Sequence, residues 1–95
     1  MRNRADRGIT FRVAGRVQGV AFRWFGCAAA RELGVTGWIR NRADGGVEGE
    51  AYGDRLRLEM FLDRLRQGPT AAQVDRLNWE EIPADEAPAS FEVRY

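Results

Sequence analysis

In the N-terminal third of the chain, the spacing between hydrophobic residues changes from every second residue to every third or fourth. Apolar Ile9, Phe11 and Val13 alternate with polar residues, which predicts a half-buried β-strand. From residue 22 the spacing becomes three or four, and Gly34 follows the last residue of this pattern, as expected for a helix that ends there. The residues on one stripe of this helix are Phe22, Phe25, Gly26, Ala29 and Leu33. The chain therefore begins with a strand followed by a helix.

The middle of the chain predicts a hairpin followed by a second helix. Residues 35–41 and 47–52 are expected to be strands, and the Asp-Gly step at residues 44–45 is typical of the turn between two paired strands. Asp54 is a suitable N-cap for a helix, and the Gly-Pro step at residues 68–69 is expected to stop it. The residues sharing a face of that helix are Leu58, Phe61, Leu62 and Leu65.

The C-terminal part completes a recognisable order of elements. Leu77 and Trp79 indicate a fourth strand, and residues 91–95 a short final one. The order β-α-β-β-α-β predicts an α+β, ferredoxin-like sandwich with two helices on one face of a mostly antiparallel sheet. We expect a single domain over residues 8–95, preceded by a flexible polar tail at residues 1–7.

Size and composition fit one small globular domain. The chain has 95 residues, of which 44% are hydrophobic and 31% charged, enough for one core. No apolar run has the length of a membrane span, and the basic start lacks the apolar region of a secretory signal. The single Cys27 cannot form an internal disulfide, in keeping with a reducing compartment. We expect a cytoplasmic monomer.

The charged residues narrow the possible chemistry. All fifteen basic residues are arginine, so lysine Schiff bases, histidine acid–base catalysis and most transition-metal sites are excluded. No metal and no cofactor are predicted. The net charge of +1 gives no general attraction to nucleic acid. Residues 1–23 carry six Arg against one Asp, and residues 75–95 six acids against two Arg, which favours either a negative ligand or pairing of these segments as neighbouring strands.

The connection between the first strand and the first helix is the strongest candidate for an anion site. Residues 15–23 read GRVQGVAFR, with glycines that let the backbone approach a ligand closely. Backbone N–H groups and the positive end of the helix converge at such a turn. Arg23 adds a planar fork of donors matched to phosphate or carboxylate. The predicted phosphate-binding residues are Gly15, Arg16, Val17, Gln18, Gly19, Val20 and Arg23.

This segment resembles the signature of the acylphosphatases, small enzymes that hydrolyse acyl phosphates. The resemblance continues in GWIRN at residues 37–41, DGGVE at 44–48, GP at 68–69 and FEVRY at 91–95. It implies metal-free hydrolysis of an acyl phosphate to a carboxylate and inorganic phosphate, with no nucleic-acid or membrane partner. It also assigns Asn41 as the residue that positions the attacking water, so Arg23 and Asn41 are the expected catalytic residues.

This reaction suits a protein without histidine. The departing carboxylate is the base of an acid with a pKa of about 4, so no strong general acid is needed. Phosphoryl transfer depends mainly on positioning and on stabilising charge on the phosphoryl oxygens. Arg23 opposes the helix dipole, and a bound anion would relieve this. The carboxamide of Asn41 can accept a hydrogen bond from water. The proton of that water goes either to the phosphate or to bulk water.

Four residues of the loop are expected to have specific roles in binding or packing. Gln18 is expected to hydrogen-bond within the loop or to substrate, with an orienting role favoured. Val17 and Val20 are expected to hold the loop on the core and to contribute only backbone N–H groups. Arg16 is expected to contribute its N–H, with its side chain facing solvent.

Five residues outside the loop are expected to have structural roles. Trp38 is expected to be a packing residue, and Cys27 an unreactive thiol away from the apolar stripe of its helix. Glu48 and Glu50 are expected on an exposed sheet edge. The C-terminal carboxylate of Tyr95 is a candidate partner for Arg23.

Two other classes of protein compete with the enzyme. One is a binding module that holds a phosphorylated metabolite without turnover, although binding alone does not need a water-positioning amide. The other is an RNA-recognition module, which needs a run of aromatic residues on its sheet that this sequence lacks. The chain also resembles the acylphosphatase-like domain of hydrogenase-maturation proteins, but a stand-alone enzyme is favoured.

Overall fold

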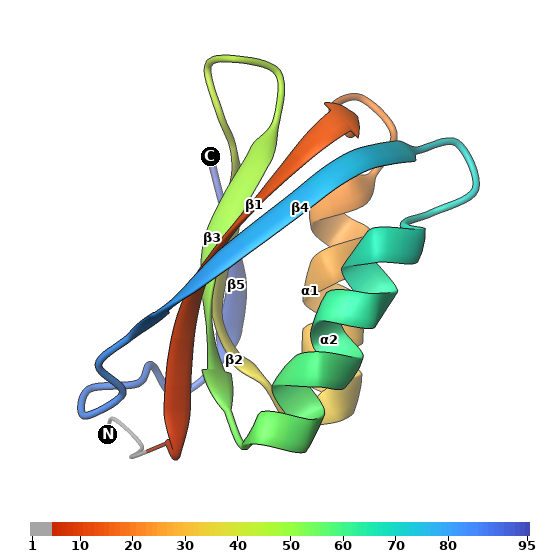
Figure 1. Cartoon of the computed structure of the whole chain (residues 1–95). Helices are drawn as coiled ribbons and strands as arrows, with labels where there is room; N and C mark the ends of the chain where they lie inside the picture. The colour runs from red at the N-terminus through yellow and green to blue at the C-terminus, as the bar shows by residue number, and fades with distance from the viewer. Residues whose placement is uncertain (1–4) are drawn as a thin grey trace.

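The computed structural model describes residues 5–95 and contains five strands and two helices within them (Figure 1). The elements are β1 (Arg7–Arg16), α1 (Phe22–Leu33), β2 (Thr36–Asn41), β3 (Val47–Gly53), α2 (Arg55–Gln67), β4 (Gln73–Ile82) and β5 (Phe91–Arg94). This is the predicted order, including the short final strand. β1 begins at Arg7, the last residue of the predicted tail, and residues 1–4 of that tail lie outside the described residues.

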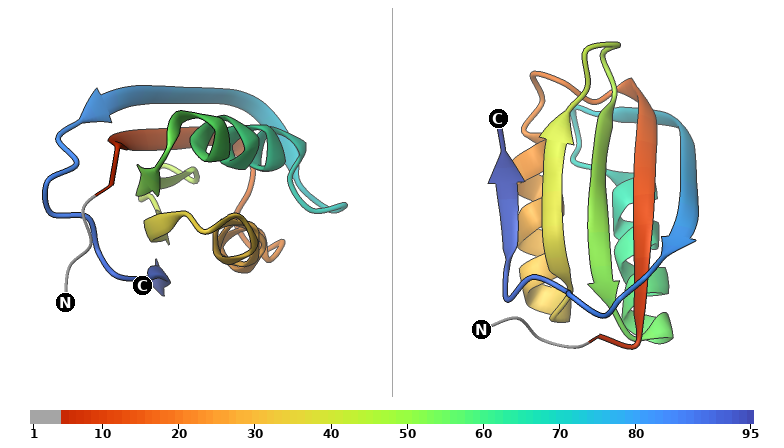
Figure 2. Two further views of the ribbon diagram at one scale, coloured as in Figure 1. Left: turned by 90° about the horizontal axis from the view of Figure 1, so that it is seen from below. Right: turned by 90° about the vertical axis from the view of Figure 1, so that its left-hand side faces the viewer.

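The strands form one sheet in the order β4-β1-β3-β2-β5. All neighbouring pairs are antiparallel except β2 and β5, which are parallel. Both helices lie on one face of the sheet, as the views in Figure 2 show. The predicted ferredoxin-like α+β class is therefore confirmed, and β5 extends the sheet along the edge beside β2.

The core lies between the sheet and the two helices. The alternation predicted for the first strand places Ile9, Phe11 and Val13 on the helix-covered face, where all three are buried. Phe61 of α2 makes edge contacts with Phe11 and Phe91, with ring centroids 5.6 Å apart in both pairs. These contacts connect α2 to the inner strand β1 and to the edge strand β5.

Local capping explains where the helices begin and end. The Asp54 side chain accepts a hydrogen bond from the backbone N–H of Arg57 at 2.8 Å, as expected of an N-cap. Gly34 ends α1 in the left-handed conformation, and its N–H bonds to the last turn of the helix. Gly68 ends α2. The predicted boundaries of both helices are confirmed.

The expected position of Cys27 is wrong. Its side chain is only 6% exposed, and its Sγ lies 3.5 Å from the backbone carbonyl of Phe91. The prediction allowed only one side of α1 to contact the sheet. Because β5 extends the sheet beyond β2, a second side of the helix is also covered. Cys27 therefore belongs to the core.

The expected edge position of Glu48 and Glu50 is also wrong, because β3 pairs with β1 on one side and β2 on the other. Glu48 contacts the guanidinium groups of Arg40 at 2.8 Å and Arg42 at 2.7 Å. Glu50 accepts a hydrogen bond from the hydroxyl of Tyr52 at 2.8 Å. Both carboxylates occupy the helix-free face of a central strand, where they have specific partners.

Trp38 packs on the same helix-free face. It alternates with Ile39, which is buried under the helices, so the indole faces the opposite way. The guanidinium groups of Arg40 and Arg94 lie 4.9 and 4.5 Å from its ring. Its packing partners are therefore cations on β2 and β5.

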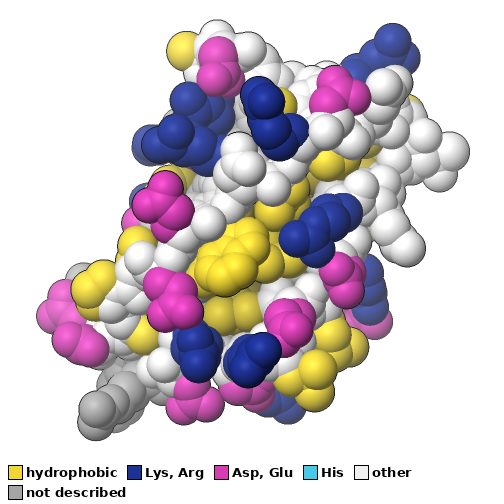
Figure 3. Space-filling model, viewed as in Figure 1, with side chains coloured by type: hydrophobic (Ala, Val, Ile, Leu, Met, Phe, Trp, Pro, Cys, Tyr) yellow, Lys and Arg dark blue, Asp and Glu magenta, His cyan; other side chains and the backbone are white. Residues whose placement is uncertain are grey.

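β4 forms the other edge of the sheet and is only partly covered by α2. Arg7 of β1 and Glu81 of β4 form an ion pair at 2.9 Å, so the basic and acidic segments do meet as neighbouring strands here. Apolar surface remains visible between β4 and α2 (Figure 3), in a groove that includes the half-exposed Trp79. Among residues 5–95, neither helix is long and apolar enough to cross a membrane.

Candidate active site

The connection between β1 and α1 bends sharply through two left-handed residues. Gly19 has φ 74°, and Ala21, the N-cap of α1, has φ 61° and ψ 27°. The alanine side chain cannot accept a hydrogen bond, so no side chain caps the start of the helix. The N–H groups of the first turn have no carbonyl partner within a helix. This connection therefore presents a helix N-terminus that suits an anion.

A pocket of about 190 Å³ opens beside this helix start. Its lining residues are Val17, Gly19, Ala21, Phe22, Arg23, Trp24, Asn41, Val93 and Tyr95. Four of the predicted site residues are thus brought together, namely Val17, Gly19, Arg23 and Asn41. They come from the loop, α1 and β2, and two C-terminal residues complete the wall.

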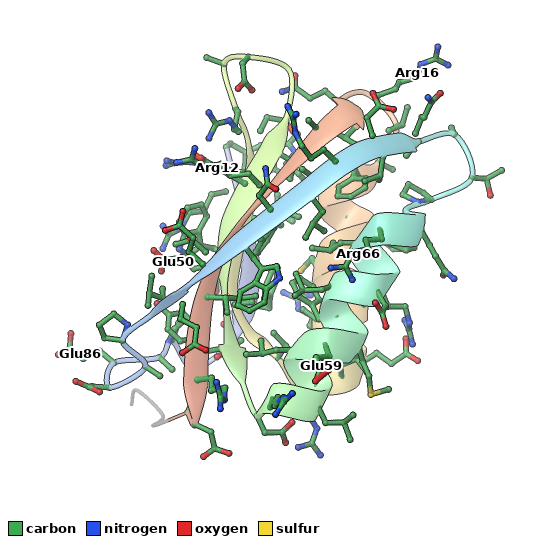
Figure 4. All side chains as sticks on the ribbon, viewed as in Figure 1. Arg12, Arg16, Glu50, Glu59, Arg66 and Glu86 are labelled. Atoms are coloured by element: carbon green, nitrogen blue, oxygen red, sulfur yellow. The ribbon has the colours of Figure 1, made fainter. Side chains whose placement is uncertain are left out.

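Gly15 and Arg16 do not line this pocket, because they still belong to β1 and pair with β4. The register shifts between Ala14 and Gly15, and a Cβ at Gly15 would lie 2.1 Å from the carbonyl oxygen of Gln73. Close approach of β4 is therefore what requires a glycine here. The Arg16 side chain points away from the molecule at the end of β1, as expected (Figure 4).

Arg23 is oriented by the C-terminal residues. Its Nη1 donates to the backbone carbonyl of Arg94 at 3.3 Å, and its guanidinium lies 4.7 Å from the centroid of the Tyr95 ring. The ring and a carbonyl, rather than the C-terminal carboxylate of Tyr95, are its partners. Because a guanidinium has several N–H donors, Arg23 keeps donors for a ligand in the pocket.

Asn41 is placed by the geometry of two strands. It lies two residues after Ile39, so its side chain is on the helix-covered face. The parallel pairing of Arg40 with Arg94 brings Asn41 beside Tyr95 at the same end of the sheet. The end of β2 thus places Asn41 among the residues that line the same pocket as Arg23.

Gln18 fastens the loop to the β2–β3 hairpin. Its side-chain amide nitrogen donates to the carbonyls of Arg42 at 2.7 Å and Gly46 at 2.8 Å. Both amide N–H groups are used in this way, so none is left to donate to substrate. The partners expected for Gln18 were the loop itself or the substrate, but the observed acceptors belong to the hairpin, so this side chain holds the loop beside the segment that follows Asn41. Val20 packs partly buried against the core, as expected.

Two acidic residues of the hairpin, Asp44 and Glu48, are paired with arginine. A hydrogen bond from the N–H of Gly46, together with Arg42, holds the pKa of Asp44 below its ordinary value. Partial burial raises the pKa of Glu48, but its bonds to Arg40 and Arg42 outweigh this and lower it. The carboxylates next to Asn41 are therefore ionised and neutralised by cations. Among residues 5–95, no three His, Cys, Asp or Glu side chains gather as a metal site.

Several residues of the pocket wall were not predicted from the sequence. The sequence does contain an indication for Trp24, because it is a large aromatic residue next to Arg23 and lies off the apolar stripe of α1. No sequence pattern indicates Val93 or Ala21 as pocket residues, since their place in the pocket depends on how β5 and the loop pack against α1.

Comparison with known proteins agrees with this architecture. Residues 9–93 match the family model described as Acylphosphatase. An acylphosphatase from Koribacter versatilis is 47% identical over 85% of this chain and 74% of its own length. One from Lactobacillus johnsonii is 44% identical over 92% of this chain and 97% of its own. The structure of an acylphosphatase from Coxiella burnetii superposes with a TM-score of 0.89 at 38% identity, over 99% of this chain and all of that one.

Proposed function

Since this chain belongs to the acylphosphatase family and is a hydrolase acting on acyl phosphates, we propose that the pocket at the start of α1 is its active site. In this proposal, residues 17–21 and Arg23 hold the phosphoryl group, and Asn41 positions the attacking water. The observation that carries the proposal is that Arg23 and Asn41, from a helix and a strand, line one small pocket with the loop.

The phosphoryl oxygens are held by groups already fixed in place. The first-turn N–H groups of α1 have no helical partners, and the guanidinium of Arg23 is oriented by Arg94 and Tyr95. Such fixed donors stabilise charge on the phosphoryl oxygens without rearranging during the reaction. Without a ligand, the positive charge of Arg23 lies near the positive end of the helix dipole, which is unfavourable. A bound anion offsets this repulsion.

The chemical step is a displacement at phosphorus. The oxygen of water forms a bond to phosphorus, and the bond between phosphorus and the acyl oxygen breaks, releasing a carboxylate and inorganic phosphate. The carbonyl oxygen of the Asn41 carboxamide accepts a hydrogen bond from the water and fixes its direction. We infer that a phosphate oxygen of the substrate takes the water proton. The carboxylate leaves without protonation because it is a weak base.

Phosphate release from benzoyl phosphate in EDTA tests this assignment. Arg23→Ala and Asn41→Ala should each lower kcat/KM by about 100-fold or more, because each removes a group that orients or stabilises the reacting atoms. Two matched variants outside the pocket, Arg66→Ala on α2 (Figure 4) and Asn78→Ala on β4, should keep wild-type activity. Circular dichroism checks that all variants are folded.

Two results would contradict the proposal. Full activity in folded Arg23→Ala or Asn41→Ala would remove the pocket as the active site. A folded wild type that binds phosphate without turning over benzoyl phosphate would make the pocket a binding site only.

We also propose that one chain is sufficient for activity, because the fold of a single chain already brings Arg23 and Asn41 to one pocket. Specific activity should then be independent of protein concentration.

A further inference from the structure

Trp24 is an exposed aromatic residue at the rim of the pocket. It follows Arg23 directly, is 73% exposed and lines the pocket wall. Exposed tryptophan is uncommon because its large apolar surface is more stable when buried. The packing of the core gives no reason for this side chain to stand here.

Trp24 also begins a second groove, of about 460 Å³, between α1 and β5. The groove is lined by Trp24, Cys27, Ala28, Arg31, Glu92 and Val93. Its four α1 residues are spaced three, four and seven apart, so they form one continuous stripe of the helix. Trp24 and Val93 line both the pocket and the groove, so the two lie side by side.

From this adjacency we infer that the groove between α1 and β5 receives the acyl part of the substrate, and that Trp24 makes the enzyme favour flat, apolar acyl groups. The inference rests on the proposed function, since it assumes that the phosphoryl group occupies the pocket. Trp24 and Val93 are then the first surfaces that the acyl group meets outside the pocket.

The direction of the reaction agrees with this placement. Water and leaving group lie on opposite sides of phosphorus in an in-line displacement. Asn41 enters the pocket from the sheet, whereas Trp24 enters from the helix layer. A leaving acyl group directed away from Asn41 therefore runs towards the wall that carries Trp24.

The two ends of the groove differ in polarity. Near the pocket its wall is apolar, and further along α1 the Nε of Arg31 donates to the carbonyl of Phe91 at 3.2 Å. A phenyl ring is large enough to stack on the indole of Trp24, whereas the methyl group of an acetyl moiety offers little surface for this contact.

The test compares kcat/KM for benzoyl phosphate and acetyl phosphate in the wild type and Trp24→Ala. The variant should lose about tenfold for benzoyl phosphate, mainly through a higher KM, and less than about twofold for acetyl phosphate. Trp24→Phe should restore most of the preference. The matched control is Trp79→Ala, which removes another exposed tryptophan from the separate groove between β4 and α2 and should leave both values unchanged.

Several outcomes would overturn the inference. An equal loss for both substrates would mean that Trp24 supports the loop, and no loss for either would mean that the acyl group does not contact it. Either result leaves the hydrolase assignment standing. If the folded wild type hydrolyses neither substrate, the proposed function fails first. Because Trp24 is exposed, its removal should not prevent folding, and Trp24→Gln provides a second variant.

Discussion

At the scale of single residues, Ala21 adopts a backbone conformation that favours glycine. Its φ of 61° and ψ of 27° lie in the left-handed region, which costs an L-residue roughly 1–2 kcal/mol. The residue begins α1 and lines the pocket, so its conformation aims the first helical turn at the proposed phosphate site. The strain is located where the site is built, as is common in functional sites.

Ala21→Gly should therefore increase the free energy of unfolding by about 0.5–1 kcal/mol, because relief of strain exceeds the added entropy of the unfolded chain. Urea denaturation measures the change. Ala28→Gly in the same helix is the control, since an exposed helical position should lose about 1 kcal/mol. Equal destabilisation by both variants would show that Ala21 carries no strain.

At the scale of elements, the β2–β3 hairpin depends on charged contacts. Arg42 binds Asp44 at 3.1 Å and Glu48 at 2.7 Å, and Arg40 also binds Glu48. The Gln18 amide then ties this hairpin to the loop. The charged contacts thus fix the segment that carries Asn41.

These contacts predict an acid-dependent loss of stability. The pKa values of Asp44 and Glu48 are held below their ordinary values of 3.8 and 4.5. A carboxyl group whose pKa is lower in the folded state stabilises the protein above the ordinary value, and the effect is lost as pH falls through the folded pKa. The contribution of the hairpin should therefore decline as pH drops below about 4.5.

Urea denaturation of the wild type and Glu48→Gln between pH 6 and pH 3 measures this contribution. At pH 6 the variant should be less stable by about 1 kcal/mol, and the difference should shrink towards pH 3 as the wild-type carboxylate becomes protonated. Glu59→Gln on α2 is the control, because its ion pair with Arg55 is exposed and should change stability by less than about 0.5 kcal/mol (Figure 4). A constant difference across the pH range would contradict the linkage.

At the scale of the whole molecule, three phenylalanines connect the core to the pocket. Phe61 of α2 is fully buried between Phe11 of β1 and Phe91 of β5. Phe91 begins the short strand that carries Val93 to the pocket wall and ends beside Tyr95. Packing far from the reaction therefore helps to place β5 and the residues that orient Arg23.

Phe61→Ala should lower the free energy of unfolding by about 3–5 kcal/mol, because it leaves a cavity among well-packed rings. Domains of this size are commonly stable by about 5–15 kcal/mol, so the variant should be folded only marginally at 37 °C. Denaturant unfolding measures the loss. Leu56→Ala in the exposed part of the same helix should stay within about 0.5 kcal/mol of the wild type. A loss below about 1 kcal/mol for Phe61→Ala would mean that the core repacks without it.

Local patterns in the amino-acid sequence were enough to predict the elements and their order. The alternation of Ile9, Phe11 and Val13 predicts a strand, because only an extended backbone places all three on one buried face. Asp54 predicts the start of a helix, because its side chain can accept a hydrogen bond from an N–H group of the first turn. The loop at residues 15–23 was found for the same reason, since its glycines and Arg23 are neighbours in sequence. The prediction for Asn41 came only from resemblance to a family, because an asparagine before a turn has no distinctive local pattern.

The neighbours of each element could be seen only in the folded chain. Glu48 was expected at an edge and lies on a central strand, because strand order depends on how the elements pack and not on the spacing within a strand. Cys27 is buried because β5 extends the sheet beneath α1. The partners of Gln18 and the shared place of Trp24 and Val93 in the pocket wall are likewise contacts between segments distant in the chain. Hydrophobic periodicity records which face of an element is buried, but packing in three dimensions selects its neighbours.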